Sequence, residues 1–228
     1  MALSPRVGRF KIEIERRWDI ADLQELSDSL LQTYGLLYLG LEGGGDLPLR
    51  HSKFVIMPDD WNTFPWGHIF YRDVVPPKQR IKIKSFHYSS PGLIEVVAIL
   101  SLLALTARVV RAWARAGDAV LALLEKVKKL LSRHRRSRQE SEITQDLVFE
   151  FGLSLGFNEE ECATLIKEAE TIGALRVLVL VATQGQRLAQ LEQQGKLVFA
   201  EAASSRRQLP PPRGGARKRP SRRKKAAQ

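Results

Sequence analysis

Cysteine is nearly absent from this chain of 228 residues, which contains only Cys162. A single cysteine excludes an intramolecular disulfide and any cysteine-rich zinc site. This scarcity is typical of a reducing compartment, so we expect a cytoplasmic protein. The first 18 residues contain no apolar h-region, and we therefore expect no secretory signal.

The motifs of metal sites, nucleotide sites and covalent catalysis are also missing. None of the four histidines lies three or four residues from another, so the sequence indicates no helical zinc site and no cofactor. The glycines at 43–45 lack the flanking residues of a phosphate-binding loop and predict a turn. Three glutamates precede Cys162 and should raise the pKa of its thiol. The best acid–base candidates, Asp59, Asp60 and His68, lie in a loop-rich segment, so an enzyme is the least favoured class.

Apolar runs long enough to span a bilayer are missing as well. The segment Leu93–Val110 is the nearest, and its longest uncharged stretch, Val96–Ala107, has twelve residues. A span needs about 20 apolar residues, and so short a stretch is more typical of a buried or interfacial helix. An apolar helix beginning near Leu93 stays open as an anchor, because Glu95 and Arg108 could lie near the two interfaces. The alternative function is therefore a membrane-associated protein, either peripheral or at the inner membrane.

Acidic residues are absent from the last 23 residues, 206–228, which carry ten Lys or Arg. Of the 36 basic residues in the chain, 26 remain outside this tail against 25 acidic ones, so the rest is nearly neutral. Leu209 is the one sizeable apolar side chain of the tail, which we therefore expect to be disordered. A tethered polycation attracts polyanions, and without an aromatic residue it would contact nucleic acid through phosphates. The expected contacts are Arg217, Lys218, Arg219, Arg222, Arg223, Lys224 and Lys225.

Charge also divides the rest of the chain. Residues 108–138 carry ten basic and two acidic residues, whereas residues 139–205 carry four basic and eleven acidic ones. We expect the acidic block partly to neutralise the basic helix before it. The alternative is a secondary polyanion-binding face, aligned along one unbroken helix because Arg115 and Lys126 lie close to three whole turns apart. Its members would be Arg108, Arg111, Arg115, Lys126, Lys129, Arg133 and Arg136.

Hydrophobic periodicity predicts an α+β fold, predominantly helical with a small sheet. Alternation with period two predicts strands over 10–15 and 80–88, the second with Ile81, Ile83 and either Phe86 or Tyr88 on its apolar face. Ser90 and Pro91 favour a helix start, so a long helix or a helix pair is expected over 91–135, with a break near Gly117. Further helices are expected over 20–39, 142–154 and 159–171, capped by Asp19, Ser141 and Asn158. Residues 175–182 suit either a strand or a helix, and a short strand is expected near 196–201.

The expected organisation is a body over 1–138, a small acidic helical unit over 139–205, and the tail over 206–228. Residues 46–79 contain five prolines and a group of aromatic side chains. Trp61, Phe64 and Trp66 are candidates for a recognition loop, and a small core beneath the loop is the alternative.

Two short elements of the chain resemble uncharacterised bacterial proteins. In those, an alternating strand ends in a Ser-Pro-Gly turn before a long helix, and a glycine-led strand comes late; the matching elements here are Arg80–Gly92 and Gly195–Ala200. The resemblance implies a bacterial source and brings no named family, activity or cofactor. We expect a non-enzymatic binding or adaptor protein whose partner is nucleic acid or another polyanion, with a membrane surface or a protein as the alternatives.

Overall fold

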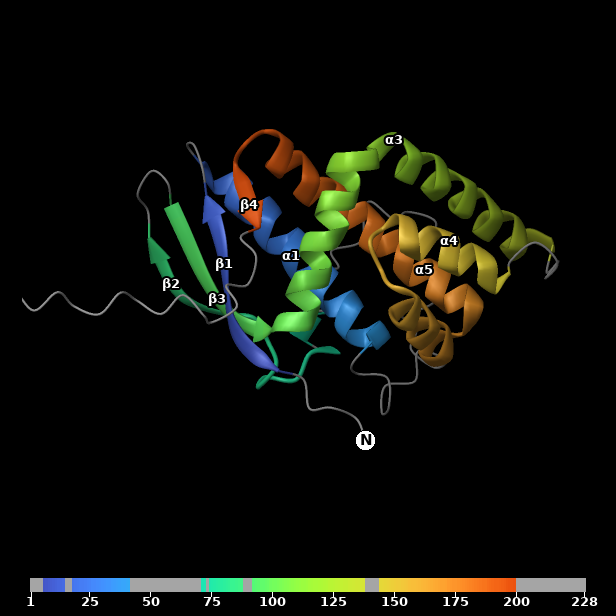
Figure 1. Cartoon of the computed structure of the whole chain (residues 1–228), viewed down its shortest axis with the longest axis horizontal. Helices are drawn as coiled ribbons and strands as arrows, with labels where there is room; N and C mark the ends of the chain where they lie inside the picture. Colours follow the sequence, from blue (N-terminus) through green and yellow to red (C-terminus); the bar gives the residue numbers. More distant parts are fainter. Residues whose placement is uncertain are drawn as a thin grey trace, which may run out of the picture.

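The computed structural model describes residues 6–14, 18–41, 71–72, 74–87, 92–137 and 144–199, with only the backbone of 134–137. The described chain is α+β and mostly helical, as the sequence predicts (Figure 1). Its elements in order are β1 (Val7–Ile14), α1 (Ile20–Leu41), β2 (Lys82–His87), β3 (Gly92–Ile99), α3 (Leu100–Ser137), α4 (Gln145–Ser154), α5 (Glu159–Gln193) and β4 (Leu197–Phe199).

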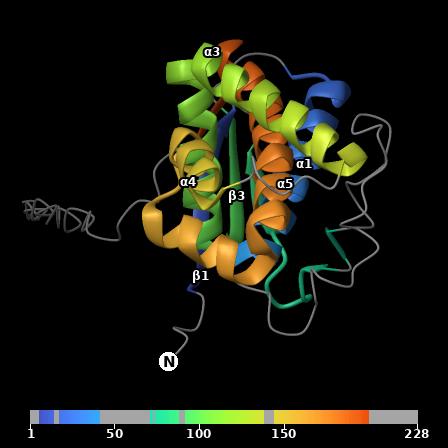
Figure 2. The same cartoon turned by 90° about the vertical axis from the view of Figure 1, so that its right-hand side faces the viewer.

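The four strands form one antiparallel sheet in the order β2-β3-β1-β4. The alternation seen in the sequence decides its two faces: Phe10 and Ile12 of β1 are buried, whereas Arg9, Lys11 and Glu13 are exposed. Figures 1 and 2 show that the described helices all lie on one side of this sheet. The other side, which carries the charged residues of β1, is covered by no described helix and is called the open face.

The predicted strand at 80–88 is confirmed as β2, but its apolar face is not buried. The side chains of Ile83 and Phe86 are 68% and 44% exposed. The register places both opposite core-facing residues of β3, so they point to the helical side of the sheet. They are exposed because β2 is the edge strand that lies farthest from the helices, which do not extend over it (Figure 1).

The helix start predicted at Ser90 and Pro91 is wrong, because Gly92–Ile99 is the strand β3 and α3 begins at Leu100. Four of the eight residues of β3 are Val or Ile, which suit a strand, and it pairs with β1 on one side and β2 on the other. The half-buried positions Leu93 and Val97 of β3 are apolar as well, so the segment lacks a clean alternation and resembled the first turns of an apolar helix. The anchor helix beginning near Leu93 is therefore absent. No helix in the described part of the chain is long and apolar enough to cross a membrane.

The helix pair expected after the strand is present, and its break falls next to Gly117. Ala116 has φ −140° and ψ 38°, outside the helical range, so α3 consists of two helical halves. Figure 1 shows the first half running beside the sheet and the second half turning away over α4 and α5. The two basic rows of the sequence therefore belong to helices with different directions.

The remaining helices begin directly after the residues that cap them. Asp19 accepts from the amide N of Asp22 at 2.8 Å and begins α1 as predicted, but α4 is capped by Thr144 rather than Ser141, which lies outside the described residues. Asn158 forms the expected cap of α5, strengthened by a reciprocal bond from its own amide to Glu161. Helix α5 has a kink at Glu170 (φ 56°, ψ 170°), close to the predicted end of the helix over 159–171. The ambiguous residues 175–182 are helical in its second half, and the late strand is confirmed as β4.

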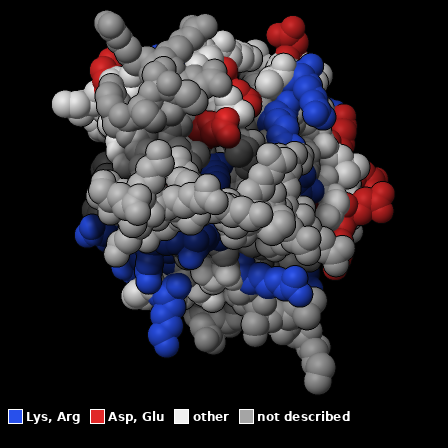
Figure 3. All heavy atoms as spheres, turned by 60° about the vertical axis from the view of Figure 1, so that its left-hand side comes forward, with Lys and Arg blue, Asp and Glu red and all other residues white. Residues whose placement is uncertain are grey.

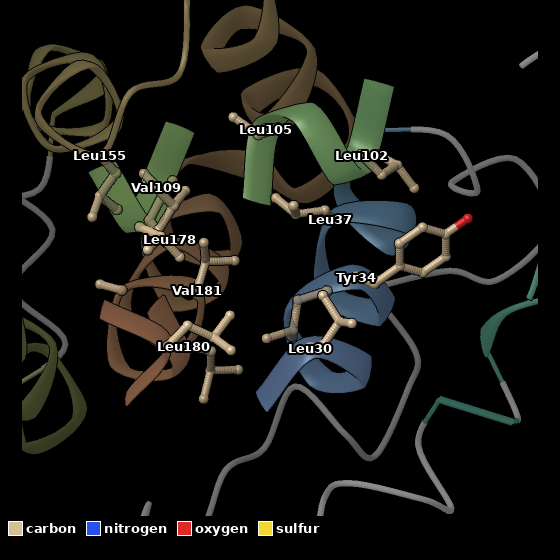
Figure 4. Packing of buried hydrophobic residues seen from close by; sticks show 14 of the residues in the cluster. Leu30, Tyr34, Leu37, Leu102, Leu105, Val109, Leu155, Leu178, Leu180 and Val181 are labelled. Carbon is tan, nitrogen blue, oxygen red and sulfur yellow. The ribbon is translucent and has the colours of Figure 1, made fainter. Parts of the chain in front are cut away.

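One hydrophobic core connects the sheet with helices α1, α3, α4 and α5. Helix α5 passes through its centre and is buried over most of its second half. A Cβ atom at Gly185 would collide with Val109, so glycine is required for the close approach of α5 to α3. Figure 4 shows leucine, valine and tyrosine side chains of α1, α3 and α5 meeting between the helices; among them are Leu30, Tyr34, Leu37, Leu102, Leu105, Val109, Leu178, Leu180 and Val181.

Candidate polyanion-binding surfaces

The predicted tail contacts Arg217–Lys225 lie outside the described residues, and so do Trp61, Phe64 and Trp66. The structure does show where the chain that leads to the tail leaves the sheet. Strand β4 is the last described element, and its Phe199 pairs with Ile12 in the C-terminal half of β1. The tail is therefore attached through residues 200–205 to one edge of the sheet.

This attachment point is held to the start of α1 by two polar contacts. The Nζ of Lys196 donates to Oδ1 of Asp22 at 2.5 Å, and the indole N–H of Trp18 donates to the carbonyl of Lys196 at 3.1 Å. The hydrogen bond from Lys196 lowers the pKa of Asp22 below its ordinary value of 3.8. Both side chains of the pair are less than one quarter exposed, and the two contacts hold the residue just before β4 against the start of α1.

The secondary basic face predicted over 108–136 is not one continuous face. The kink at Ala116 separates Arg108, Arg111 and Arg115 from the later lysines. The near-integral number of turns between Arg115 and Lys126 aligns them only if the helix is unbroken. The side chain of Arg136 lies outside the described residues.

The acidic block neutralises part of this face, as the charge pattern predicts. Arg108 and Glu161 approach to 2.5 Å, and Lys126 and Glu150 to 3.6 Å. Burial raises the pKa of Glu192, and the nearby charge of Arg111 lowers it to a smaller extent. The exposed cations of the set are Arg115, Lys126, Lys129 and Arg133.

A second group of cations lies at the opposite edge of the sheet and was not singled out from the sequence. Residues 74–94 contain no Asp or Glu and include Lys78, Arg80, Lys82 and Lys84, which we call the basic strip. The three lysines are exposed. The guanidinium of Arg80 donates to the carbonyls of Val75 and Arg72 at 2.8 and 2.6 Å, so it closes the turn before β2.

Tyrosine side chains attach the basic strip to the core. The hydroxyl of Tyr34, a fully buried residue of α1, donates to the carbonyl of Gln79 at 2.8 Å and accepts from the amide of Ile99 at 3.1 Å. The hydroxyl of Tyr71 accepts from the amide of Ile81 at 2.5 Å, and burial raises its pKa. These bonds fix the turn that contains Lys78 and the start of β2, where Lys82 lies.

The open face of the sheet connects the two edges. The pairing register and the exposure pattern place Arg9, Lys11 and Lys82 on this face with two carboxylates, Glu13 and Glu95. Glu95 is engaged by Arg9 at 3.7 Å and by the Ser85 hydroxyl at 3.3 Å. Figure 3 brings this side of the molecule forward and shows Lys and Arg gathered at its lower left, where no Asp or Glu is visible.

Two chemical features of the described residues bear on catalysis. They contain no group of three or more His, Cys, Asp and Glu side chains that could hold a metal ion. Burial, and then the charges of Glu161 and Glu159, raise the pKa of the Cys162 thiol to about 11. Such a thiol is protonated at neutral pH and is a poor nucleophile. His87 is exposed on β2.

The signal for the basic strip was present in the sequence. In the alternating segment that predicted the second strand, Arg80, Lys82 and Lys84 occupy successive polar positions. What the alternation could not show is that this strand lies at an edge of the sheet and borders the face that no described helix covers. No known protein family, characterised protein or solved structure matches the chain, in agreement with the expectation of no named family.

Proposed function

We propose that this protein is a non-enzymatic binding or adaptor protein that holds a polyanion through its basic tail, and that the polyanion is nucleic acid. The observation that carries the proposal is the separation of charge: ten cations and no carboxylate in residues 206–228, against a nearly neutral remainder. Cations bound to phosphates release condensed counterions, which supplies affinity without reading sequence. The fixed attachment of β4 to α1 supports the role of the folded part as a carrier for the tail.

The test compares the full chain with a variant that lacks residues 206–228, using a labelled DNA duplex of arbitrary sequence. Deletion should remove most of the affinity. The slope of log K against log salt should flatten by about 0.9 for each phosphate that the shortened protein no longer binds. Unchanged affinity and slope in the tailless protein would contradict the proposal.

A matched control replaces every arginine of the tail by lysine. Binding should change little, because point charges suffice where no base is recognised by a bidentate guanidinium. Vesicles of anionic lipid serve as competitor in the same assay. If they displace the duplex at equal charge concentration, the tail is a general anion contact and the membrane surface becomes the favoured partner.

A further inference from the structure

The three basic surfaces differ in how much of their charge is available. The α3 cations are divided by the kink at Ala116 and partly paired with Glu161 and Glu150. The basic strip has three exposed lysines in a stretch of chain without acidic residues, and it borders the open face. The β2 edge therefore offers cations in a stretch of chain without carboxylates, whereas part of the charge on α3 is already paired.

The strip and the root of the tail lie at the two edges of one sheet. Because β2 and β4 are separated by β3 and β1, the edges are three strand spacings apart, about 14 Å. The first tail cation, Arg206, is seven residues beyond Phe199, a length of chain that extends to about 23–25 Å. The chain between Phe199 and Arg206 is thus longer than the distance between the two edges, so the first tail cation can reach a ligand that lies across the open face.

We infer that the basic strip is a second phosphate contact for the nucleic acid held by the tail, so that the ligand lies across the open face of the sheet. This inference rests on the proposed function. Two linked contacts increase affinity through effective concentration, without either contact being strong alone. Arg9 and Lys11 lie on the open face between the two edges, where their positive charges offset the negative charges of Glu13 and Glu95.

The test uses the full chain and two variants that each remove three positive charges. The first is Lys78→Gln/Lys82→Gln/Lys84→Gln in the strip. The control is Lys128→Gln/Lys167→Gln/Arg187→Gln, three cations of α3 and α5 that belong neither to the strip nor to the predicted secondary face. Both variants should keep the melting temperature of the unchanged protein, because surface substitutions have small effects on stability.

The strip variant should bind a labelled DNA duplex at least about tenfold more weakly at low salt. Its salt slope should be flatter by nearly 0.9 for each phosphate that the three lysines had neutralised. The control variant should keep the unchanged slope. An unchanged slope in the strip variant, or equally weakened binding in both variants, would overturn the inference.

The outcomes for the strip and for the tail are separable. If deletion of 206–228 has no effect while the strip variant binds more weakly, the proposed role of the tail fails and the strip stands as the binding surface. If deletion abolishes binding and the strip variant is unaffected, only the strip is rejected. Poly-glutamate that competes as well as DNA at equal charge would instead assign the strip to an acidic protein and overturn the nucleic-acid inference.

Discussion

Single residues hold the junctions between helices, and Gly156 is the clearest case. It lies between α4 and α5 with φ +86°, where a side chain is strained, and a Cβ there would meet the Cβ and carbonyl O of Arg108 at 3.2 Å. Since Arg108 also pairs with Glu161 at the start of α5, this contact joins three helices.

Gly156→Ala should lower the free energy of unfolding by about 1–3 kcal/mol, through backbone strain and the displacement of Arg108. Urea denaturation of the two proteins measures the difference. The matched control is Gly117→Ala, where the nearest side-chain atom, Cε3 of Trp113, is 3.9 Å from the added Cβ. That variant should be at least as stable as the unchanged protein, and a comparable destabilisation in both would remove the special role of Gly156.

The pair of Lys196 and Asp22 should make stability depend on pH. The folded pKa of Asp22 lies below its ordinary value of 3.8, so the pair stabilises the folded state above that pH and loses this contribution as pH falls through the lowered value. Asp22→Asn should therefore be less stable than the unchanged protein at neutral pH, and the difference should shrink in acid. Denaturation midpoints measured from neutral pH to below 3.8 test this. If the stability difference between the two proteins stays constant with pH, the loss of stability comes from the cap of α1 and not from the ion pair.

At the scale of the elements, α3 stabilises the fold through the apolar stripe of its first half. Leu103 and Val110 are fully buried, whereas Leu100 is only half-buried because it lies at the junction with β3. Arg115 is exposed, whereas Arg111 is half-buried near Glu192 in the last turn of α5.

Leu103→Ala should lower the free energy of unfolding by about 2–5 kcal/mol, the usual range for a large apolar side chain removed from a core. Leu121→Ala, at a 40% exposed position in the second half of α3, is the matched control and should change it by less than about 1 kcal/mol. Equal effects would mean that the two halves of α3 contribute alike to one core.

At the scale of the whole molecule, stability and charge are expected to reside in different parts of the chain. The described core ends at Phe199, and the tail has one sizeable apolar side chain. Deleting 206–228 should therefore change the free energy of unfolding by less than about 0.5 kcal/mol while lowering the net charge by ten. Amide hydrogen exchange of the full chain is the second measurement, and protected amides beyond residue 206 without a partner would contradict this division.

Features that depend on local chemistry could be predicted from the amino-acid order alone. Alternation of apolar and polar residues predicted β1 and β2. An Asp or Asn directly before a helical pattern predicted the caps at Asp19 and Asn158, because the side-chain oxygen of these residues accepts from a backbone amide of the first turn. Charge counting predicted that acidic residues of α4 and α5 would pair with α3. Each of these rests on residues close together in the chain or on composition.

Features that depend on neighbours in space emerged only from the folded arrangement. The run Leu93–Ile99 is a strand because β1 and β2 pair with it on both sides, a condition that its own apolar residues do not reveal. Ile83 is exposed because β2 lies at the edge of the sheet, and an alternating pattern is the same at an edge and in the centre. For the same reason the basic strip could be recognised as a surface only once the sheet was known to have a face without a described helix over it.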